Sequence, residues 1–196
     1  MKKNISSLEI NWEGPFRWAR NNIGKSDLPD YPGIYLWTIE YSLGGYIVYA
    51  AGITRRTIKK RFHEHTLNIL NGIYTLFDLE KMKQGQRKEI WHGFWMGKRS
   101  PDKEKEFERR RLELEELAHQ HLDTFRVFTA EVPTEGRILE RLEAAVMENT
   151  YNLPKPLSEI PDRGMQLSPR RETESPIIIN YTYKEKLHGM PDRMII

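Results

Sequence analysis

The chain lacks cysteine altogether: none occurs among its 196 residues. Disulfides, thiolate metal sites and cysteine nucleophiles are therefore excluded. Long apolar runs are also missing, since none approaches the roughly 20 residues that a membrane-spanning helix needs. The first seven residues are not followed by the apolar segment typical of a secretion signal. These absences predict a cytoplasmic protein with no membrane partner.

An excess of charge of one sign is nearly absent as well. Lys and Arg total 31 against 28 for Asp and Glu, which gives a net charge of +3. This balance is compatible with nucleic-acid binding but does not indicate it, so the distribution of charge is more informative. Basic residues gather at Arg55, Arg56, Lys59 and Lys60, and we take these four as candidate nucleic-acid contacts. A solvated helix face is the alternative reading of such a cluster.

The length fits one domain, or one domain with a sizeable insertion. No internal repeat or low-complexity segment occurs. We divide the chain into an N-terminal leader (residues 1–30), a core (31–158) that contains an insertion (71–124), and a C-terminal extension (159–196). In the leader, Leu8–Ile10 indicates a short strand and Pro15–Trp18 the start of a short helix.

The core begins with two apolar, aromatic-rich segments, residues 33–39 and 45–51, which predict an antiparallel hairpin with a turn at Gly44-Gly45. A basic helix is expected over residues 55–70, with Thr54 or Thr57 as its cap. Its apolar line consists of Ile58, Phe62 and Ile69. Because a helix advances about 100° per residue, Arg61 and His65 lie one turn apart beside this line. Both side chains are therefore expected where the helix meets the sheet.

Further along the chain, residues 102–122 are dense in charge and predict a largely exposed helix. Residues 125–132 alternate as a strand and end at Pro133. A helix over 137–150 has one apolar face. The extension is rich in proline and turns, with one strand expected at residues 177–181.

The order of these elements resembles the core of the GIY-YIG nuclease family. The resemblance rests on Gly33-Ile34-Tyr35 in the first strand, on Tyr49 and Gly52 in the second, and on Arg61 with His65 in the helix. It implies an α+β fold: a small three-stranded antiparallel sheet flanked by helices, with a helical and loop insertion and a C-terminal extension. It also implies one active site for cutting a phosphodiester bond.

The resemblance assigns roles to three of these side chains. Tyr35 would position or deprotonate the attacking water, Arg61 would neutralise the scissile phosphate, and His65 would shuttle a proton or bind phosphate. Arginine suits its role because its planar fork binds phosphate oxygens bidentately and stays charged. The alternatives are a core tyrosine, a surface arginine and a histidine bonded to a backbone carbonyl.

Tyr49 departs from the family pattern. The family has its tyrosine two residues before the glycine, whereas Tyr49 stands three before Gly52. A slip of one residue turns a strand side chain to the other face. Either a β-bulge restores the geometry, or Tyr46 or another residue serves instead.

Glu143 is the predicted metal ligand. Of the three glutamates in the helix 137–150, Glu143 borders the apolar face, Glu140 is farther round and Glu148 faces away. A carboxylate at the edge of a buried face needs a partner, and Mg²⁺ or Mn²⁺ prefers oxygen ligands. A salt bridge to Arg61 is the alternative.

Two features fit the family less well. Where members commonly have an asparagine near the end of the core, this chain has Ser158, with Asn149 and Asn152 nearby at shifted spacing. A second Gly72-Ile73-Tyr74 follows a helix and lacks a hairpin partner, so we treat it as a coincidence.

The sequence therefore predicts a divalent-metal-dependent endonuclease acting on DNA. Stand-alone members of the resembled family include type II restriction endonucleases that cut as dimers, which suggests a homodimer. The alternative is a catalytically inactive nucleic-acid-binding module on the same fold. A third interpretation is a protein-interaction domain that docks through the charged helix 102–122.

Overall fold

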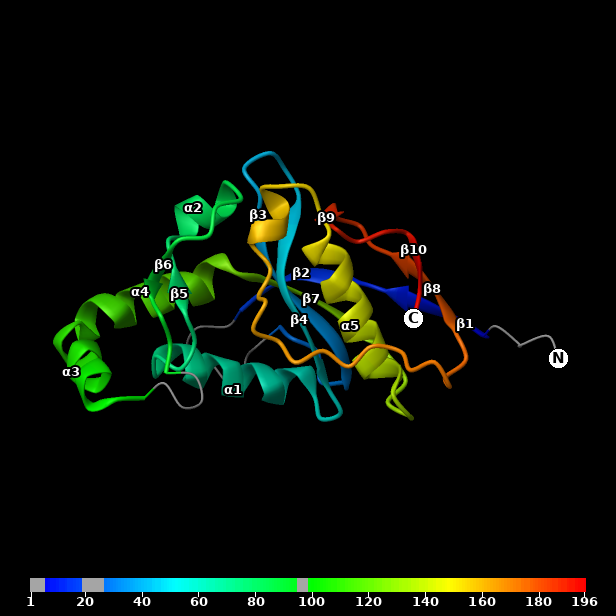
Figure 1. Ribbon diagram of the computed structural model, residues 1–196, viewed down its shortest axis with the longest axis horizontal. Coiled ribbons are helices and arrows are strands. Elements are labelled where there is room, and N and C mark those ends of the chain that lie inside the picture. Colours follow the sequence, from blue (N-terminus) through cyan, green and yellow to red (C-terminus); the bar gives the residue numbers. More distant parts are fainter. Residues whose placement is uncertain (1–5, 19–26, 95–98) are drawn as a thin grey trace.

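The computed structural model describes residues 6–18, 27–94 and 99–196 (Figure 1). A five-stranded sheet lies at its centre, in the order β2-β7-β3-β4-β9. Its strands are β2 (Glu13–Arg17), β3 (Gly33–Glu40), β4 (Tyr46–Thr54), β7 (Arg126–Glu131) and β9 (Leu187–His188). All neighbours in it pair antiparallel except β4 and β9, which are parallel.

The predicted three-stranded sheet is therefore wrong. Strands β7, β3 and β4 form only the middle of the sheet, because residues outside the predicted core extend both of its edges. The leader supplies β2 where a helix was expected, and the extension supplies β9. Both added strands are short, and β2 contains Gly14 and Pro15, which are usually depleted in strands.

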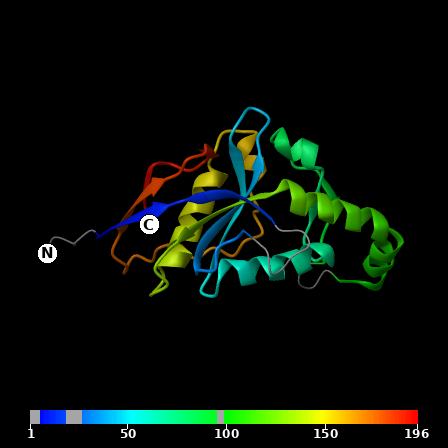
Figure 2. The ribbon, with the colours of Figure 1, turned by 180° about the vertical axis from the view of Figure 1, so that it is seen from behind.

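A second sheet, β1-β8-β10, joins the two ends of the chain (Figure 2). It consists of β1 (Ser6–Asn11), β8 (Ile177–Thr182) and β10 (Arg193–Ile195). Strands β1 and β8 are parallel, whereas β10 pairs antiparallel with β8. The predicted strands at residues 8–10 and 177–181 are thus confirmed, and they pair with each other.

The two faces of the central sheet bury separate cores. On one face, Trp37 and Ile39 pack against α1 (Ile58–Leu70) and the insertion. On the other face, Ile34 and Leu36 pack against α5 (Ile138–Tyr151) and the second sheet. Successive side chains of β3 alternate between these faces, as the two-residue period of a strand requires. Figure 1 shows α1 and α5 flanking β4.

Helix α1 begins where the sequence indicates. The Thr57 side chain accepts a hydrogen bond from the Lys60 amide and so caps the first turn. The predicted apolar line, Ile58, Phe62 and Ile69, is buried against the sheet. Of the two candidate caps, Thr57 is therefore the one used.

The insertion forms its own small layer. It contains β5 (Leu76–Phe77), α2 (Leu79–Lys83), β6 (Glu89–Trp91), α3 (Pro101–Arg109) and α4 (Arg111–Thr124). The expected single helix is divided at Arg110, between α3 and α4. Helix α3 buries no residue, as predicted, but α4 buries four: Leu114, Ala118, His121 and Leu122.

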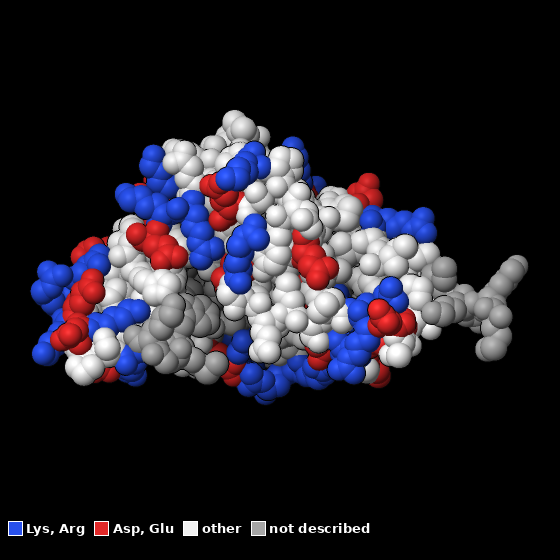
Figure 3. Space-filling model, in the orientation of Figure 1, with Lys and Arg blue, Asp and Glu red and all other residues white. Residues whose placement is uncertain are grey.

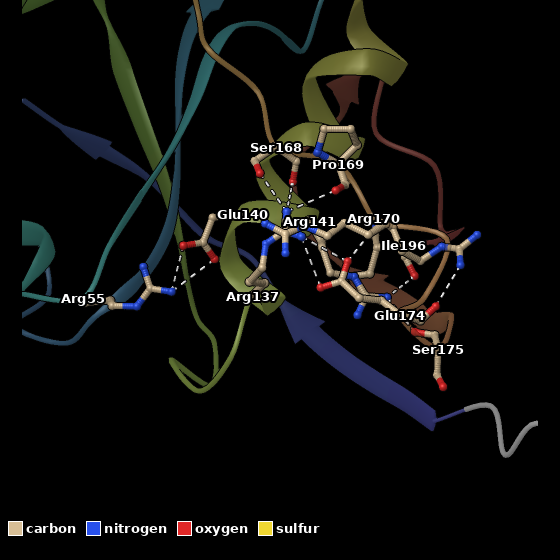
Figure 4. Close-up of polar contacts among 11 residues, drawn as sticks. Arg55, Arg137, Glu140, Arg141, Ser168, Pro169, Arg170, Glu174, Ser175 and Ile196 are labelled. Atoms are coloured by element: carbon tan, nitrogen blue, oxygen red, sulfur yellow. Dashed lines mark hydrogen bonds and ion pairs between the residues drawn. The ribbon is translucent and has the colours of Figure 1, made fainter.

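The C-terminal extension is held against α5 by two arginines (Figure 4). Arg137 donates hydrogen bonds to Ser168 and Pro169 and pairs with Glu174. Arg141, which is buried, donates to the carbonyl oxygens of Ser175 and Ile196. Together these bonds fix the path of the extension between η1 (Leu157–Glu159) and β8. No helix in the described ranges is long and apolar enough to cross a membrane.

Candidate functional site

One cavity of about 360 Å³ lies beside the C-terminal half of β4. Its lining includes every side chain that the sequence indicated for chemistry: Tyr35, Tyr49, Arg61, His65 and Glu143. These residues come from β3, β4, α1 and α5, and more than 100 residues of sequence separate the first from the last. The tertiary fold therefore brings the five together.

The free part of the edge of β4 explains how α1 and α5 can both reach the cavity. Strand β9 pairs with β4 at Tyr46 and Ile47, and within the described ranges no strand pairs with residues 50–53 on that side. Helix α1 packs on one face of the sheet and α5 on the other. Glu143 from α5 and His65 from α1 consequently line the same cavity around residues 50–53.

Gly52 makes room for Tyr35. The two residues stand opposite each other in the β3–β4 pair. A methyl group at Gly52 would overlap the Tyr35 ring and its hydroxyl group. The phenol lies across the glycine, so a side chain at position 52 would displace it from the cavity.

A β-bulge places Tyr49 on the same face as Tyr35. Trp37 pairs with Ala50 and Thr38 with Val48, which leaves Tyr49 as the extra residue. Its ring stacks near Trp37, with 6.1 Å between the centroids. Tyr46 instead packs against Phe128 in the other core. Of the alternatives left open by the sequence, the bulge is the one found, and the catalytic role of Tyr49 stays a prediction.

His65 lies at the centre of a buried hydrogen-bond chain. Its Nε2 is 2.8 Å from the Tyr35 hydroxyl and its Nδ1 is 2.9 Å from the Tyr74 hydroxyl. Burial and the nearby Arg61 lower the pKa of His65 to about 3, so the imidazole is neutral at neutral pH. The alternative of a histidine bonded to a backbone carbonyl is wrong, because both ring nitrogens contact phenols.

Arg61 connects the cavity to the surface. Its Nε donates to the Tyr35 hydroxyl over 3.4 Å, and its Nη1 pairs with Glu64 at 2.9 Å. Burial alone would lower the pKa of Arg61, but Tyr35 and Glu64 raise it above its ordinary value. Arg56 also binds Glu64, and the two arginines together lower the pKa of that carboxyl to about 2. Arg61 is therefore charged at any working pH.

Glu143 is partly buried in the cavity wall. Burial, and secondarily Glu140, raise the pKa of Glu143 to about 7, with Arg61 acting in the opposite direction. The predicted alternative of a salt bridge to Arg61 is not found, and no other residue in the described ranges bonds the carboxylate.

The surroundings of Glu143 fit a divalent cation. A desolvated carboxylate without a cationic partner gains most from binding one, and Mg²⁺ is commonly held by one or two carboxylates with water and substrate oxygens. Among the described residues, no group of three or more His, Asp or Glu side chains forms a metal cluster. Two carboxylates line the cavity, Glu143 and Asp162, and the role of Glu143 as a metal ligand stays a prediction.

The four predicted nucleic-acid contacts lie outside the cavity lining. Arg55 pairs with Glu140 at 2.8 Å and Arg56 with Glu64, whereas no ion pair of Lys59 or Lys60 is found in the described ranges. Figure 3 shows basic side chains along the edge of the molecule where α1 lies, with acidic side chains among them. The two lysines are consequently the members of this cluster with charge available to a partner.

The sequence reasoning missed two contributors to the cavity. Tyr74, from the second Gly-Ile-Tyr that was set aside as a coincidence, binds His65. Asp162 comes from the extension, and its amide donates to the Tyr49 carbonyl at 2.7 Å. None of Asn149, Asn152 and Ser158 lines the cavity. The repeated tripeptide was the only signal that could have pointed to Tyr74.

Comparisons of the chain with protein-family models, with curated proteins and with solved structures find no match.

Proposed function

We propose that the chain is a divalent-metal-dependent endonuclease, of the GIY-YIG type that the sequence resembles, which hydrolyses phosphodiester bonds in DNA in the cytoplasm. The observation that carries the proposal is the convergence of four different groups on one cavity: the Tyr35 phenol, the Arg61 guanidinium, the neutral His65 imidazole and the Glu143 carboxylate, which pairs with no other described residue. Phosphodiester hydrolysis needs these functions together: a positioned water, charge on the phosphoryl oxygens and a carboxylate for a cation.

Arg61 has donors to spare for the phosphate. A guanidinium carries five N–H groups. One Nε donor goes to Tyr35 and one Nη1 donor to Glu64, so about three of the five remain. They would bind the non-bridging oxygens of the scissile phosphate next to the Tyr35 hydroxyl. A water bonded to Tyr35 would then lie close to the phosphorus atom, which is the positioning that in-line attack requires.

Glu143 would hold the cation, from the opposite side of the cavity. When bound, Mg²⁺ or Mn²⁺ would supply positive charge for the leaving oxygen. Glu143 itself would contribute a carboxylate that burial has already stripped of much of its water. Since one site of this kind cuts one strand at a time, we extend the proposal to a homodimer that cuts both strands.

The test is cleavage of plasmid libraries of high sequence diversity with Mg²⁺ or Mn²⁺. The wild type should cut them and should lose cutting in EDTA. Tyr35→Phe and Glu143→Ala should each lose cutting as well. Glu148→Ala is the matched control for Glu143, because Glu148 is exposed on the same helix, and it should cut normally. Wild-type protein that leaves the whole library intact would overturn the proposal.

One observation favours the inactive nucleic-acid-binding module as a second candidate. The cavity contains none of the asparagines or serine that could replace the expected asparagine, and Arg61 already pairs with Glu64. Retardation of DNA in EDTA, without any cutting when metal is added, would favour this module.

A further inference from the structure

We propose that His65 and Tyr74 extend Tyr35 into a hydrogen-bonded relay that carries the proton of the attacking water away from Tyr35, with Tyr74 as the positioning residue at the far end. The inference rests on the proposed function and deepens it. It assigns a role to a residue outside the sequence pattern that suggested the nuclease.

The relay is an unbroken chain of contacts. Arg61 Nε lies 3.4 Å from the Tyr35 hydroxyl, which in turn lies 2.8 Å from His65 Nε2. On the other side of the ring, His65 Nδ1 lies 2.9 Å from the Tyr74 hydroxyl. Asn68 Nδ2 then donates to the Tyr74 hydroxyl at 3.0 Å. Tyr35 and His65 are buried, whereas Tyr74 is only partly buried and also lines the cavity, so the chain leads from the Tyr35 hydroxyl through His65 to a more accessible hydroxyl.

Tyr74 is held in this position by the backbone as well. Helix α1 ends at Leu70, and Gly72, which follows the cap residue Asn71, has a φ of 67° in the left-handed region that glycine adopts readily. The chain then folds back, and the amides of Ile73 and Tyr74 both donate to the Asn68 carbonyl. Asn68 therefore binds Tyr74 at its main chain and at its hydroxyl group.

The two ends of the chain can only donate, and this restricts the pattern between them. Arg61 and the Asn68 amide nitrogen have no lone pair to offer. Two arrangements of the protons satisfy the contacts that join these residues. In the first, Tyr35 donates to Nε2 and His65 donates from Nδ1 to Tyr74. In the second, Tyr74 donates to Nδ1 and His65 donates from Nε2 to Tyr35. A neutral imidazole can adopt either form.

Only the first arrangement can take a proton from water. There the Tyr35 oxygen donates its own proton to His65, accepts from Arg61 and keeps one lone pair free. In the second arrangement both lone pairs are occupied, by Arg61 and by His65. The competent form therefore carries its imidazole proton on Nδ1, facing Tyr74.

The proton transfer balances as follows. One O–H bond of the attacking water breaks as its proton passes to the Tyr35 oxygen. The former phenol proton of Tyr35 moves to Nε2, the Nδ1 proton moves to the Tyr74 oxygen, and Tyr74 passes its own hydroxyl proton on to water. The hydroxide bonds to phosphorus while the bond to the leaving oxygen breaks. The leaving oxygen keeps the bonding electron pair and takes one proton from water, which balances the proton released at Tyr74. His65 ends in the other tautomer, and no buried group has gained a charge.

The test combines Tyr74→Phe with Tyr183→Phe as a matched control. Tyr183 lies outside the cavity lining and its hydroxyl also makes two hydrogen bonds, to Met190 and Asp192. Tyr74→Phe leaves Nδ1 without its acceptor, which favours the tautomer with the proton on Nε2. We expect kcat for DNA cleavage to fall about 10- to 100-fold with KM unchanged. We also expect nitrogen NMR of His65 to shift towards the Nε2–H form, while Tyr183→Phe changes neither measurement.

The outcomes separate the relay from the nuclease proposal. If Tyr74→Phe cuts at the wild-type rate, or slows with the His65 tautomer unchanged, the relay is overturned and the nuclease stands. If the wild type cuts no DNA in a diverse library, the nuclease and its relay fall together. In that case the NMR comparison alone still supports or overturns the positioning of His65 by Tyr74.

Discussion

The cavity contains two buried histidines whose surroundings differ in one respect. His65 and His121 are 5% and 3% exposed, and burial lowers the pKa of His65 to about 3 and that of His121 to about 4. His121 bonds only to the backbone: its Nε2 accepts from the Phe77 amide at 2.9 Å and its Nδ1 donates to the Leu117 carbonyl at 2.8 Å. His65 bonds to two hydroxyl groups instead.

This difference in partners decides what each ring can do. An amide N–H only donates and a carbonyl only accepts, so His121 has one possible tautomer. A phenol donates and accepts, so His65 has two. Burial and a lowered pKa alone therefore do not mark a functional histidine in this protein. The type of atom that each ring nitrogen contacts is the better criterion.

The largest expected effect is on DNA cleavage, which should depend on His65 far more than on His121. His65→Ala should lower kcat for DNA cleavage about 10²- to 10⁴-fold, because it removes the acceptor of the Tyr35 proton. His121→Ala, assayed well below its melting temperature, should stay within a few-fold of wild type. Single-turnover cleavage of a plasmid library measures both. Equal losses in the two variants would abolish the distinction.

Stability should show the reverse order. His121→Ala leaves the Phe77 amide buried without an acceptor and opens a cavity, so we expect a loss of about 2–4 kcal/mol in unfolding free energy. In His65→Gln the amide can keep a bond to one phenol, and the loss should be about 1 kcal/mol. Urea denaturation followed by circular dichroism compares them. A smaller loss for His121→Ala would contradict a structural role.

The two histidines should contribute alike to the loss of unfolding free energy in acid. A difference in activity between their variants would then come from the partners of each ring and not from burial. Each folded-state pKa lies below the unfolded value of 6.5, so between pH 6.5 and about 4 the unfolded chain binds more protons. Stability therefore falls as the pH falls through this window, by on the order of 2 kcal/mol per histidine between pH 6.5 and 4.5. Unfolding free energies against pH for His65→Gln and His121→Gln should both be flatter than for wild type.

The smallest expected effect concerns Glu143, a carboxylic acid that lines the same cavity. Its pKa of about 7 lies above the ordinary value of 4.5, so between these two values the folded chain binds more protons than the unfolded chain, and it loses stability as the pH rises from 4.5 to 7. At pH 8, Mg²⁺ at ten times its dissociation constant should add about 1.4 kcal/mol to the wild type. Differential scanning fluorimetry should show this gain in Glu148→Gln and not in Glu143→Gln.

Some elements of the fold could be predicted from the local sequence, and others could not. Local periodicity and capping predict the hairpin β3–β4, helix α1 with its Thr57 cap, strand β7 and helix α5. Strands β2 and β9 could not be read locally. The first contains Gly14 and Pro15, and the second has two residues, so both depend on the edges to which they bond. The predicted three-stranded sheet failed for this reason.

The candidate site shows the same division. The positions of Arg61, His65 and Glu143 beside apolar faces could be predicted from the sequence, because they follow from spacing along α1 and α5. The bulge that brings Tyr49 to the cavity and the contact between Tyr74 and His65 became visible in the folded structure. The face of a helix or strand from which a side chain projects depends on the periodicity of that helix or strand. Which distant groups it meets depends on how the elements pack, and no local pattern encodes that.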